Sequence, residues 1–535
     1  MAIHIQRQTA PDLEIEWQFD ADEFGPVEQW LNDRVPDTVS IAAGETRRLS
    51  DTYFDTEDWR LYRAGYVLRV RRRGKRAEAT MKSLAPAEDG LRRRRELTQP
   101  LGDGGLEKLE EGGTVGDLLK TLRGVRELRP LFENRTWRRT FVVRLRDSDS
   151  RNAGEIALDD CEIWKPEVRS AREGAEFFRL LRVEVEVPAE SAEMRQFVDA
   201  LRQDLGLLPA SRSKFGTGLL AAGLEPTVEP DFGPTGFDAS STAGQVAFAV
   251  LRRNFAIMLA REPGVRLGDD PEELHDMRVA TRRLRNALRI YANLLPRRAG
   301  RYERDLKHVA DALGEVRDLD VHIAMFADDP EDEDSRRIVD ILGEHRTRVR
   351  ERMLAVLDSK RYERLVADFS GTLRRGRSPS PDESILAVAP GLVRDRHKKA
   401  RKAAKKLDAS ASPEDYHRLR KRSRRLRYTL EPLADIYGEP VEKAIARLKK
   451  LQDALGLHQD AVVAADLLRE LGADEDLPQR VSFQMGVRAG RMLREAEDIQ
   501  DSLPESGAFR SLKKGKKWKG LWKEMEARIP EQADG

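Results

Sequence analysis

Two hydrophobic patterns divide the chain. Between residues 11 and 220, short segments alternate apolar and polar residues, among them LEIEWQF, YVLRVRRR, TFVVRLR and LRVEVEV. Successive side chains of a strand point to opposite faces, so a period of two predicts antiparallel β-strands. From about residue 243 to residue 522 the apolar positions instead recur with helical spacing, among many Leu, Ala, Arg and Glu residues. The patterns together predict a β-rich N-terminal part and an all-helical C-terminal part.

A stretch rich in proline, glycine and small polar residues, EPTVEPDFGPTGFDASST, separates the two patterns. Such residues are typical of turns and linkers rather than of packed elements. We therefore expect domains at 11–220 and 243–522, joined by a linker at 221–242 and followed by a tail at 523–535.

The helical part contains an internal repeat. LHDMRVATRRLRNAL (274–288) aligns with YHRLRKRSRRLRYTL (416–430) at an offset of 142 residues. The same offset aligns a second pair of blocks, KHVADALGEVRDLDV and KKLQDALGLHQDAVV. Two separated blocks that share one offset indicate a duplicated helical unit, with repeats at about 243–375 and 385–520.

The basic residues of the first aligned block lie on one stripe of a helix, because spacings of three and four return to the same face. Like charges placed in this way repel by a few tenths of a kcal/mol per pair. The planar guanidinium group suits phosphate oxygens, so a stripe from each repeat, facing the other, would line a groove for a linear polyanion. A solvated basic face is the alternative and, for the two aligned histidines, so is metal coordination. The residues that we expect to bind the polyanion are His275, Arg278, Arg282, Arg285, Arg289, Lys307, His417, Arg420, Arg424, Arg427 and Lys449.

The repeated H-x-x-R-x-x-x-R-R-x-R pattern and the D-A-L-G-x-x-x-D element resemble the CHAD domain, the conserved histidine α-helical domain. The resemblance covers about residues 243–520. It implies a bundle of two four-helix-like repeats and the binding of inorganic polyphosphate.

Charged residues of the N-terminal part occupy alternate positions of the predicted strands. Glu14, Glu16 and Gln18 share one face of the first strand, and Glu184 and Glu186 share one face of a late strand. One interpretation is a sheet with one dry and one wet face. The other is a closed barrel with the charged faces inward, where carboxylates would hold a hard divalent cation and basic residues would bind phosphates.

Several motifs of this part resemble the CYTH domain, the triphosphate tunnel metalloenzyme family. LEIEWQF resembles its E-x-E-x-K signature, and DTYFDTEDWRLYRAGYVLRVRRRG resembles Y-[FY]-D-T followed by L-R-x-R. TMKS, ALDD, VEVEV and SRSKFGTG resemble the later lysine, aspartate, paired-glutamate and basic motifs. The resemblance covers about residues 11–220. It implies an eight-stranded antiparallel tunnel that hydrolyses triphosphates with Mg²⁺ or Mn²⁺.

The resemblance also implies roles for single residues. The metal candidates are Glu14, Glu16, Asp159, Glu184 and Glu186. The triphosphate-binding candidates are Arg69, Arg71, Arg93, Arg95, Arg135, Arg138, Arg212 and Lys214. Lys82 is the candidate catalytic residue that would help to activate water, a role that requires a depressed pKa. Gln18 stands where the signature has lysine, and this loss of charge would narrow the substrate range, slow turnover or mark a domain that only binds.

Charge and cysteine usage narrow the class of protein. Charged residues make up 36% of the 535 residues, but the net charge is only +2, which argues against a uniformly basic protein that coats nucleic acid. The single cysteine, Cys161, excludes an intrachain disulfide and fits a reducing compartment. The chain start lacks a signal-peptide pattern, and no stretch approaches the ~20 apolar residues that span a bilayer. We therefore expect a cytoplasmic protein with no membrane partner.

Motifs of other chemistries are absent from the sequence. It has no zinc-finger spacing, RNA-recognition signature, phosphate-binding G-x-x-x-x-G-K loop or G-x-S-x-G elbow, so we expect no specific nucleic-acid partner. The expected fold is an α+β multidomain protein, with an antiparallel β-barrel tunnel and flanking helices before an all-α bundle of two repeated units. The expected function is hydrolysis of inorganic triphosphate, or of a related triphosphate, with polyphosphate binding by the helical domain and association with polyphosphate granules. The alternative is a non-catalytic polyphosphate-binding or granule-targeting protein with a degenerate tunnel.

Overall fold

The computed structural model divides the chain into two compact units, residues 1–228 and 229–535, which are described separately below. The structure describes residues 13–529 except for 75, 103–104, 107–108, 110–111, 147–151, 166–176, 228, 328–332, 380–382, 409–410 and 474–476.

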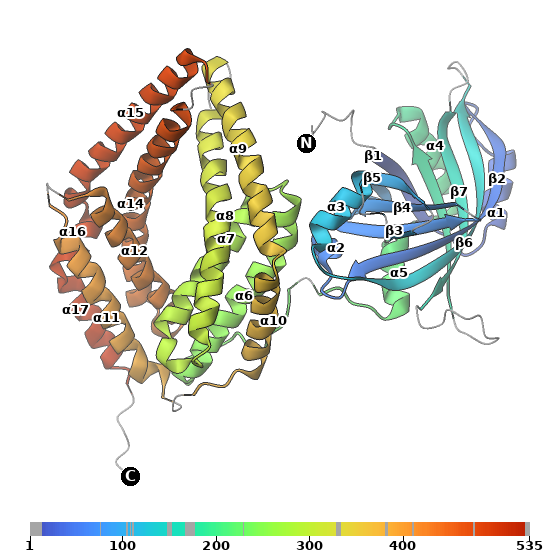
Figure 1. Cartoon of the computed structure of the whole chain (residues 1–535). Coiled ribbons are helices and arrows are strands. Elements are labelled where there is room, and N and C mark those ends of the chain that lie inside the picture. The colour runs from blue at the N-terminus through green and yellow to red at the C-terminus, as the bar shows by residue number, and fades with distance from the viewer. Residues whose placement is uncertain are drawn as a thin grey trace, which may run out of the picture. The chain divides into compact units, whose positions relative to one another are not determined.

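The N-terminal unit is a closed antiparallel β-barrel of eight strands, which confirms the fold predicted from the alternating pattern (Figure 1). Neighbouring strands follow the order β5-β4-β3-β2-β6-β7-β8-β1, and pairing of β1 with β5 closes the ring. A two-residue strand, β9 (Leu208–Pro209), adds to β1. The barrel strands are β1 (Leu13–Asp20), β2 (Val39–Thr56), β3 (Tyr66–Arg73), β4 (Arg76–Ser83), β5 (Leu91–Leu101), β6 (Leu128–Leu145), β7 (Asn152–Trp164) and β8 (Phe178–Val187).

The outer face of the barrel is the apolar face. Three apolar residues of each of β1 and β8 pack in one core with α1 (Gly25–Asp33) and α4 (Ala192–Leu205), namely Ile15, Trp17, Phe19, Val183, Val185 and Val187. Burial of this face removes apolar surface from water, which stabilises the fold by about 25 cal/mol for each Å² buried. Because strand side chains alternate, the even-numbered residues of β1 and β8 face the interior. The helical cover outside thus turns the charged faces inward.

Shorter helices fix other parts of the barrel wall. α2 (Arg60–Arg63) and α3 (Thr114–Arg123) contact each other, and α5 (Lys214–Ala222) packs on β6 and β7. Ser213 caps α5 by accepting a hydrogen bond from the Gly216 backbone N–H. Gly218 lets α5 approach the ring of Phe132, where a Cβ atom would clash. This close packing sets the position of the first residue of α5.

The C-terminal unit is helical, as the 3.6-residue periodicity predicted (Figure 1). Its first half consists of α6 (Ala243–Leu267), α7 (Pro271–Ile290), η3 (Ala292–Leu294), α8 (Ala299–Ala327), α9 (Glu333–Leu357) and α10 (Lys360–Arg375). Its second half consists of α11 (Ile385–Lys405), α12 (Pro413–Leu430), η4 (Glu431–Leu433), α13 (Ala434–Tyr437), α14 (Glu439–Gly472), α15 (Gln479–Ser502), η5 (Leu503–Glu505), α16 (Gly507–Lys514) and α17 (Lys516–Glu526).

The duplicated blocks occupy equivalent helices of the two halves. α7 and α12 carry the first block, and α8 and α14 carry the second. α7 and α12 also begin alike, with a capping residue, Asp270 or Ser412, followed by proline at the first helical position. The two halves contact each other through α7 and α12 and through α9 and α15.

The predicted tail begins within a packed helix. α17 continues to Glu526, and its Trp518, Leu521 and Met525 are buried against the helical core. Residues 530–535 of that predicted tail lie outside the described residues. No helix among the described residues is both long and apolar enough to cross a membrane.

Candidate functional site

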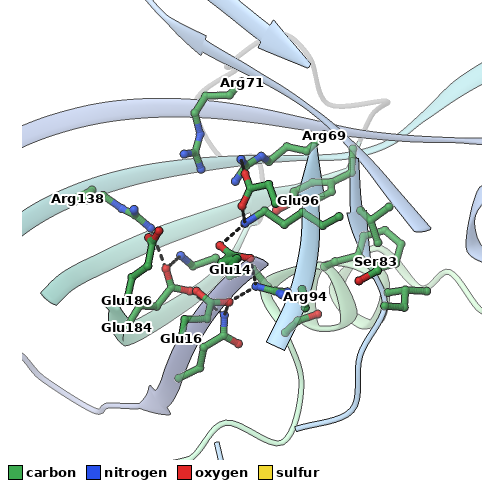
Figure 2. Close-up of a pocket in the computed structure, with 18 residues that line it drawn as sticks. Glu14, Glu16, Arg69, Arg71, Ser83, Arg94, Glu96, Arg138, Glu184 and Glu186 are labelled. Carbon is green, nitrogen blue, oxygen red and sulfur yellow. Dashed lines mark hydrogen bonds and ion pairs between the residues drawn. The ribbon is translucent and has the colours of Figure 1, made fainter. Parts of the chain in front are cut away.

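The barrel encloses a cavity of about 150 Å³ whose walls are mostly charged. Figure 2 shows Arg69, Arg71 and Arg138 on one side and several glutamates facing them. The lining residues are Glu14, Glu16, Gln18, Tyr53, Val67, Arg69, Arg71, Lys82, Ser83, Leu84, Arg94, Glu96, Arg138, Glu184, Glu186, Ser213, Lys214 and Phe215.

Neighbouring strands β1 and β8 supply four of the glutamates. The register pairs Glu16 with Glu186 and places Glu184 opposite Gln18, so their side chains leave the sheet on the same inner face. Glu14 and Glu16 both form ion pairs with Arg94. Glu186 forms no ion pair with any residue that the structure describes, and burial together with the charge of Glu14 raises its pKa.

The opposite wall is basic and is held by a buried aspartate. Arg71 donates from Nε and Nη2 to the two carboxylate oxygens of Asp51, each at 2.7 Å. Burial raises the pKa of Asp51, but the charge of Arg71 outweighs it and brings the pKa to about 2. Arg69 lies 3.9 Å from the same carboxylate. Asp51 therefore fixes two arginines of β3 toward the cavity.

Lys82 of β4 lies between two carboxylates. Its Nζ is 2.5 Å from Glu14 Oε1 and 2.9 Å from Glu96 Oε2. Burial opposes the ionisation of Glu96, but the charges of Lys82 and Arg69 lower its pKa to about 2. The ammonium group is thus placed at the cavity wall with its donors directed to acidic partners.

Asp159 holds the far end of the basic wall. It is completely buried and binds Arg138 and Lys214. Glu184 contacts the same two cations, each at 2.8 Å. These contacts lower the pKa of Glu184 despite its burial and raise the pKa of Lys214. Asp159 and Glu184 therefore share Arg138 and Lys214, whereas Glu14 and Glu16 share Arg94.

Gln18 joins the acidic wall to two further arginines. Its Nε2 donates to Glu16 Oε1 at 2.7 Å and to Glu184 Oε1 at 3.0 Å. Its Oε1 accepts from Arg92 Nε at 3.2 Å and from Arg182 Nη1 at 3.3 Å. The side chain is 2% exposed and uses both ends of its amide.

Four of the sequence-predicted triphosphate residues do not line the cavity. Arg93 pairs with Glu190 on the outside at 2.5 Å, and Arg95 shares its strand face. Arg135 pairs with Glu133 at 2.9 Å, outside the cavity lining. Arg212 is also outside that lining, and it is exposed. These four residues therefore lie outside the cavity lining, and their role in triphosphate binding stays a prediction.

Arg94, Glu96 and Asp51 are cavity or wall residues that sequence reasoning missed. Leu91 packs in the outer apolar core, and residues two apart share a face, so Arg93 and Arg95 lie outward with Leu91. Arg94 and Glu96 consequently face inward. The position of Leu91 at the start of the arginine run was the available signal.

The chemistry of the acidic wall fits a divalent cation. Carboxylate oxygens are the donors that Mg²⁺ and Mn²⁺ prefer, and Glu14, Glu16 and Glu186 present them from adjacent strands. Among the described residues, no three acidic, histidine or cysteine side chains are already gathered in metal-binding geometry. Arg94 Nη2 contacts both Glu14 and Glu16 in this structure.

The helical unit has a second charged cavity, of about 450 Å³, between its two halves. Equivalent residues of the repeat line it from α7 and α12, namely His275 with His417, Arg278 with Arg420 and Arg282 with Arg424. α8 and α14 add further residues, and we call this cavity the arginine groove. Its remaining lining residues are Arg317, Asp318, Val321, His322, Arg427, Gln452, Asp453, Gln459, Asp460 and Val463.

The repeats also reproduce an ion pair in the arginine groove. Arg278 lies 3.4 Å from Asp318, and the equivalent Arg420 lies 3.7 Å from Asp460. Burial and the neighbouring charges Arg282 and Arg420 lower the pKa of Arg424. Arginine nevertheless stays protonated in proteins, so the crowded cations favour an anionic partner.

Four predicted polyanion residues lie outside the arginine groove. Arg285 and Arg289 both pair with Glu303 of α8. Lys307 pairs with Asp311 at 3.2 Å on the surface. Lys449 lines a different cavity, of about 420 Å³, on another side of α14. The helical stripe therefore extends beyond the groove, and only part of it faces the equivalent stripe.

Two family models match the chain in the order of its two units. The CYTH domain model matches residues 21–214, and the CHAD domain model matches residues 249–469. The chain belongs to the proteins that carry a CYTH domain followed by a CHAD domain. CYTH family members are triphosphatases or cyclases, and the tunnel enzymes use divalent metal ions.

Similar proteins match either most of this chain or one part of it. An uncharacterized protein of Mycobacterium tuberculosis is 26% identical over 94% of this chain and 97% of its own length. The crystal structure of a CHAD domain from Ricinus communis is 25% identical and covers 52% of this chain and 98% of that chain, with a TM-score of 0.45. A Hippeastrum protein described as revealing a dominant triphosphatase activity is 17% identical and covers 40% of this chain and 97% of that chain, with a TM-score of 0.28.

Proposed function

We propose that the barrel hydrolyses inorganic triphosphate, or a related triphosphate, with Mg²⁺ or Mn²⁺, and that the arginine groove binds inorganic polyphosphate. The observation that carries the first half is the division of one enclosed cavity into an acidic wall on β1 and β8 and a basic wall on β3, β6 and α5. A compact polyanion held with a divalent cation requires both walls.

The basic wall would bind the phosphate oxygens of a triphosphate. Arg69, Arg71, Arg138 and Lys214 line the cavity and are fixed by buried carboxylates, so little ordering remains when the substrate binds. Positioning and charge neutralisation supply most of the catalysis of phosphoryl transfer. These cations would stabilise the charge that develops on the transferred group.

The acidic wall would hold the metal ion through Glu14, Glu16 and Glu186. A metal bound there would polarise a phosphoryl oxygen and neutralise charge. Arg94 would leave its glutamates for a phosphate oxygen as the substrate enters. Lys82 would position the attacking water through its ammonium donors, since its Nζ already lies at the wall beside Glu14.

The arginine groove supports the second half of the proposal. Arg278, Arg282, Arg420 and Arg424 converge from two repeats on one cavity. Guanidinium groups bind phosphate oxygens in bidentate geometry, and the repeated phosphates of a chain match a repeated set of arginines. The groove would bring polyphosphate to the protein or direct the protein to polyphosphate granules.

A barrel that only binds triphosphate is the second candidate, and Gln18 is the observation that favours it. Gln18 carries no charge, and its amide group donates hydrogen bonds to Glu16 and Glu184. Hydrolysis separates the two candidates. The purified protein would be incubated with tripolyphosphate, ATP, pyrophosphate and long-chain polyphosphate, each with Mg²⁺ or Mn²⁺, and released phosphate would be measured.

Release from tripolyphosphate or a nucleoside triphosphate supports the enzyme. Saturable tripolyphosphate binding without release from any of the four substrates supports the binding barrel. Separate retention of long-chain polyphosphate by the full chain tests the arginine groove, and absence of that retention contradicts the second half of the proposal.

A further inference from the structure

Two buried arginines, Arg92 and Arg182, contact the side of Gln18 that faces away from Glu16 and Glu184. Arg92 is 6% exposed and Arg182 is 1% exposed, and neither lines the cavity. Arg92 Nη1 donates to Ala85 O at 3.0 Å, and Arg182 Nη1 donates to Arg212 O at 3.0 Å. Arg182 Nη2 also pairs with the half-exposed carboxylate of Asp20 at 3.0 Å, whereas Arg92 has no ion-pair partner among the described residues. Their guanidinium groups are therefore fixed, and Gln18 is the side chain through which they reach the cavity wall.

The amide of Gln18 connects unlike charges at its two ends. Its carbonyl oxygen accepts from both arginines, and its amino group donates to Glu16 and Glu184. A hydrogen-bonded chain of this kind polarises each of its members, so positive charge behind the amide strengthens its donation in front. Glutamine is suited to this position because it has both an acceptor and two donors.

We infer that Arg92 and Arg182 supply, through Gln18, the positive charge that the CYTH signature places on a lysine at this position. Gln18 is then a positioning residue. The positive charge beside Glu16 and Glu184 is kept, but two arginines carry it in place of one lysine. Any effect of this arrangement on catalysis rests on the proposed function. The contacts of Gln18 with the two arginines are present in the folded barrel whether or not it is an enzyme.

A lysine at position 18 conflicts with this arrangement. Its ammonium group could donate to Glu16 and Glu184, but it offers no acceptor to Arg92 and Arg182. It would also add a third cation in a buried space where like charges repel more strongly than in water. Burial, and to a lesser extent the charge of Arg182, already lower the pKa of Arg92.

A double-mutant cycle that moves one positive charge tests the inference. The variants are Gln18→Lys, Arg182→Gln and the double variant, which moves the positive charge from β8 to β1. We expect Gln18→Lys alone to lower the barrel Tm by about 5 °C and to weaken tripolyphosphate binding, measured by calorimetry, by about tenfold. The double variant should recover most of both losses, because residues in one network couple strongly.

Two further variants separate repulsion from simple loss of the amide. Gln18→Met removes the hydrogen bonds without adding charge and should be less harmful than Gln18→Lys. Gln203→Lys adds the same charge on the exposed surface of α4 and should change neither readout. If Gln18→Lys alone does not fold, folding of both Gln18→Met and the double variant supports the inference, and a double variant that also fails to fold overturns it.

Additive effects of the two substitutions overturn the inference. So does tighter binding or faster hydrolysis by Gln18→Lys with Arg182 intact, because the missing lysine would then be a true deficit. Both principal readouts are independent of turnover. Coupling in a protein that hydrolyses no triphosphate upholds the charge arrangement and refutes only the proposed enzyme.

Discussion

Arg138 donates two hydrogen bonds to Asp159, from Nε to Oδ1 at 2.8 Å and from Nη2 to Oδ2 at 2.6 Å. Lys214 pairs with the same completely buried carboxylate. The sequence placed Asp159 among the metal candidates, but these contacts give it the geometry of an anchor for two phosphate-side cations. Glu14 is also paired with two cations but lines the barrel cavity, whereas Asp159 is completely buried and lies outside the cavity lining, where a metal ion would not reach it.

Asp159→Asn and Glu186→Gln should therefore act differently. Asp159→Asn should destabilise the barrel by about 3 kcal/mol, because it leaves Arg138 and Lys214 with one buried carboxylate partner, Glu184, in place of two. It should raise the KM for triphosphate while the metal concentration for half-maximal activity stays unchanged. Glu186→Gln should raise that metal concentration by about tenfold or more. Titration of Mg²⁺ and Mn²⁺ at saturating substrate measures the difference.

Asp160→Asn is the matched control for Asp159→Asn. Asp160 pairs on the outer side of the same strand with exposed Arg179, and such a pair contributes only about 0–1 kcal/mol. A shift of the metal titration by Asp159→Asn equal to that by Glu186→Gln would restore Asp159 to the metal site.

Neighbouring arginines of β5 should differ in triphosphate binding. Arg94→Met should weaken tripolyphosphate binding by about tenfold, since a charged hydrogen bond contributes roughly 1.5–3 kcal/mol. Arg93→Met should leave binding unchanged, because Arg93 pairs with Glu190 outside the cavity. Calorimetric titration of both variants measures the contrast, and equal losses would contradict the inward orientation of Arg94.

The Asp51–Arg71 pair should make barrel stability depend on acid pH. The folded pKa of Asp51, about 2, lies below its ordinary value near 3.8, so the pair stabilises the fold fully above about pH 4. This contribution, roughly 2 kcal/mol, should disappear as the pH falls from about 4 to about 2. Urea unfolding followed by tryptophan fluorescence across this range measures it.

Asp51→Asn should remove that part of the pH dependence and destabilise the barrel at neutral pH by about 3–5 kcal/mol. Asp33→Asn, at an exposed carboxylate of α1, serves as the control. An unchanged acid slope in Asp51→Asn would mean that other carboxylates cause it.

Polyphosphate binding should depend on the converging arginines. Changing Arg278, Arg282, Arg420 and Arg424 together to Ala should abolish binding and leave the helical content unchanged. Binding by the native protein should weaken with salt, because each cationic contact to a polyanion releases counterions, with a slope of about 0.7–0.9 per contact for nucleic acids. Polyphosphate retention measured at several salt concentrations gives that slope.

Lys307→Ala with Lys449→Ala is the control for the arginine groove, since both lysines lie outside it. The pair should lower affinity only slightly. Salt-sensitive binding that survives the four-arginine change would refute the groove as the polyphosphate site.

Strand and helix periodicity predicted the architecture, because each barrel strand has one apolar face and each repeat carries the same pattern. The sequence could not easily assign the run RRRRE of β5, where consecutive basic residues hide the alternation, and a shift of one residue turns every side chain to the other face. Leu91 resolves it only once the outer face is known to be the apolar one.

The extent of the arginine groove was likewise beyond the sequence. The aligned stripe continues to Arg289 and includes Lys307 and Lys449, but a repeat alignment does not say which parts of two helices face each other. Glu303 forms ion pairs with Arg285 and Arg289, and it lies outside the aligned blocks. The role of Gln18 was also hidden, because Arg92 and Arg182 meet it only through the barrel closure.

Metal-dependent release of phosphate from tripolyphosphate tests the central claim most directly. The native protein would be compared with a Glu14→Gln, Glu16→Gln double variant during titration with Mg²⁺ or Mn²⁺, after circular dichroism has shown that both fold. We predict saturable release by the native protein and a loss of about 100-fold or more in the variant, as expected when transition-state charge stabilisation is removed. No release by folded native protein that binds tripolyphosphate, or equal release by the variant, would contradict the assignment of the barrel cavity as an active site.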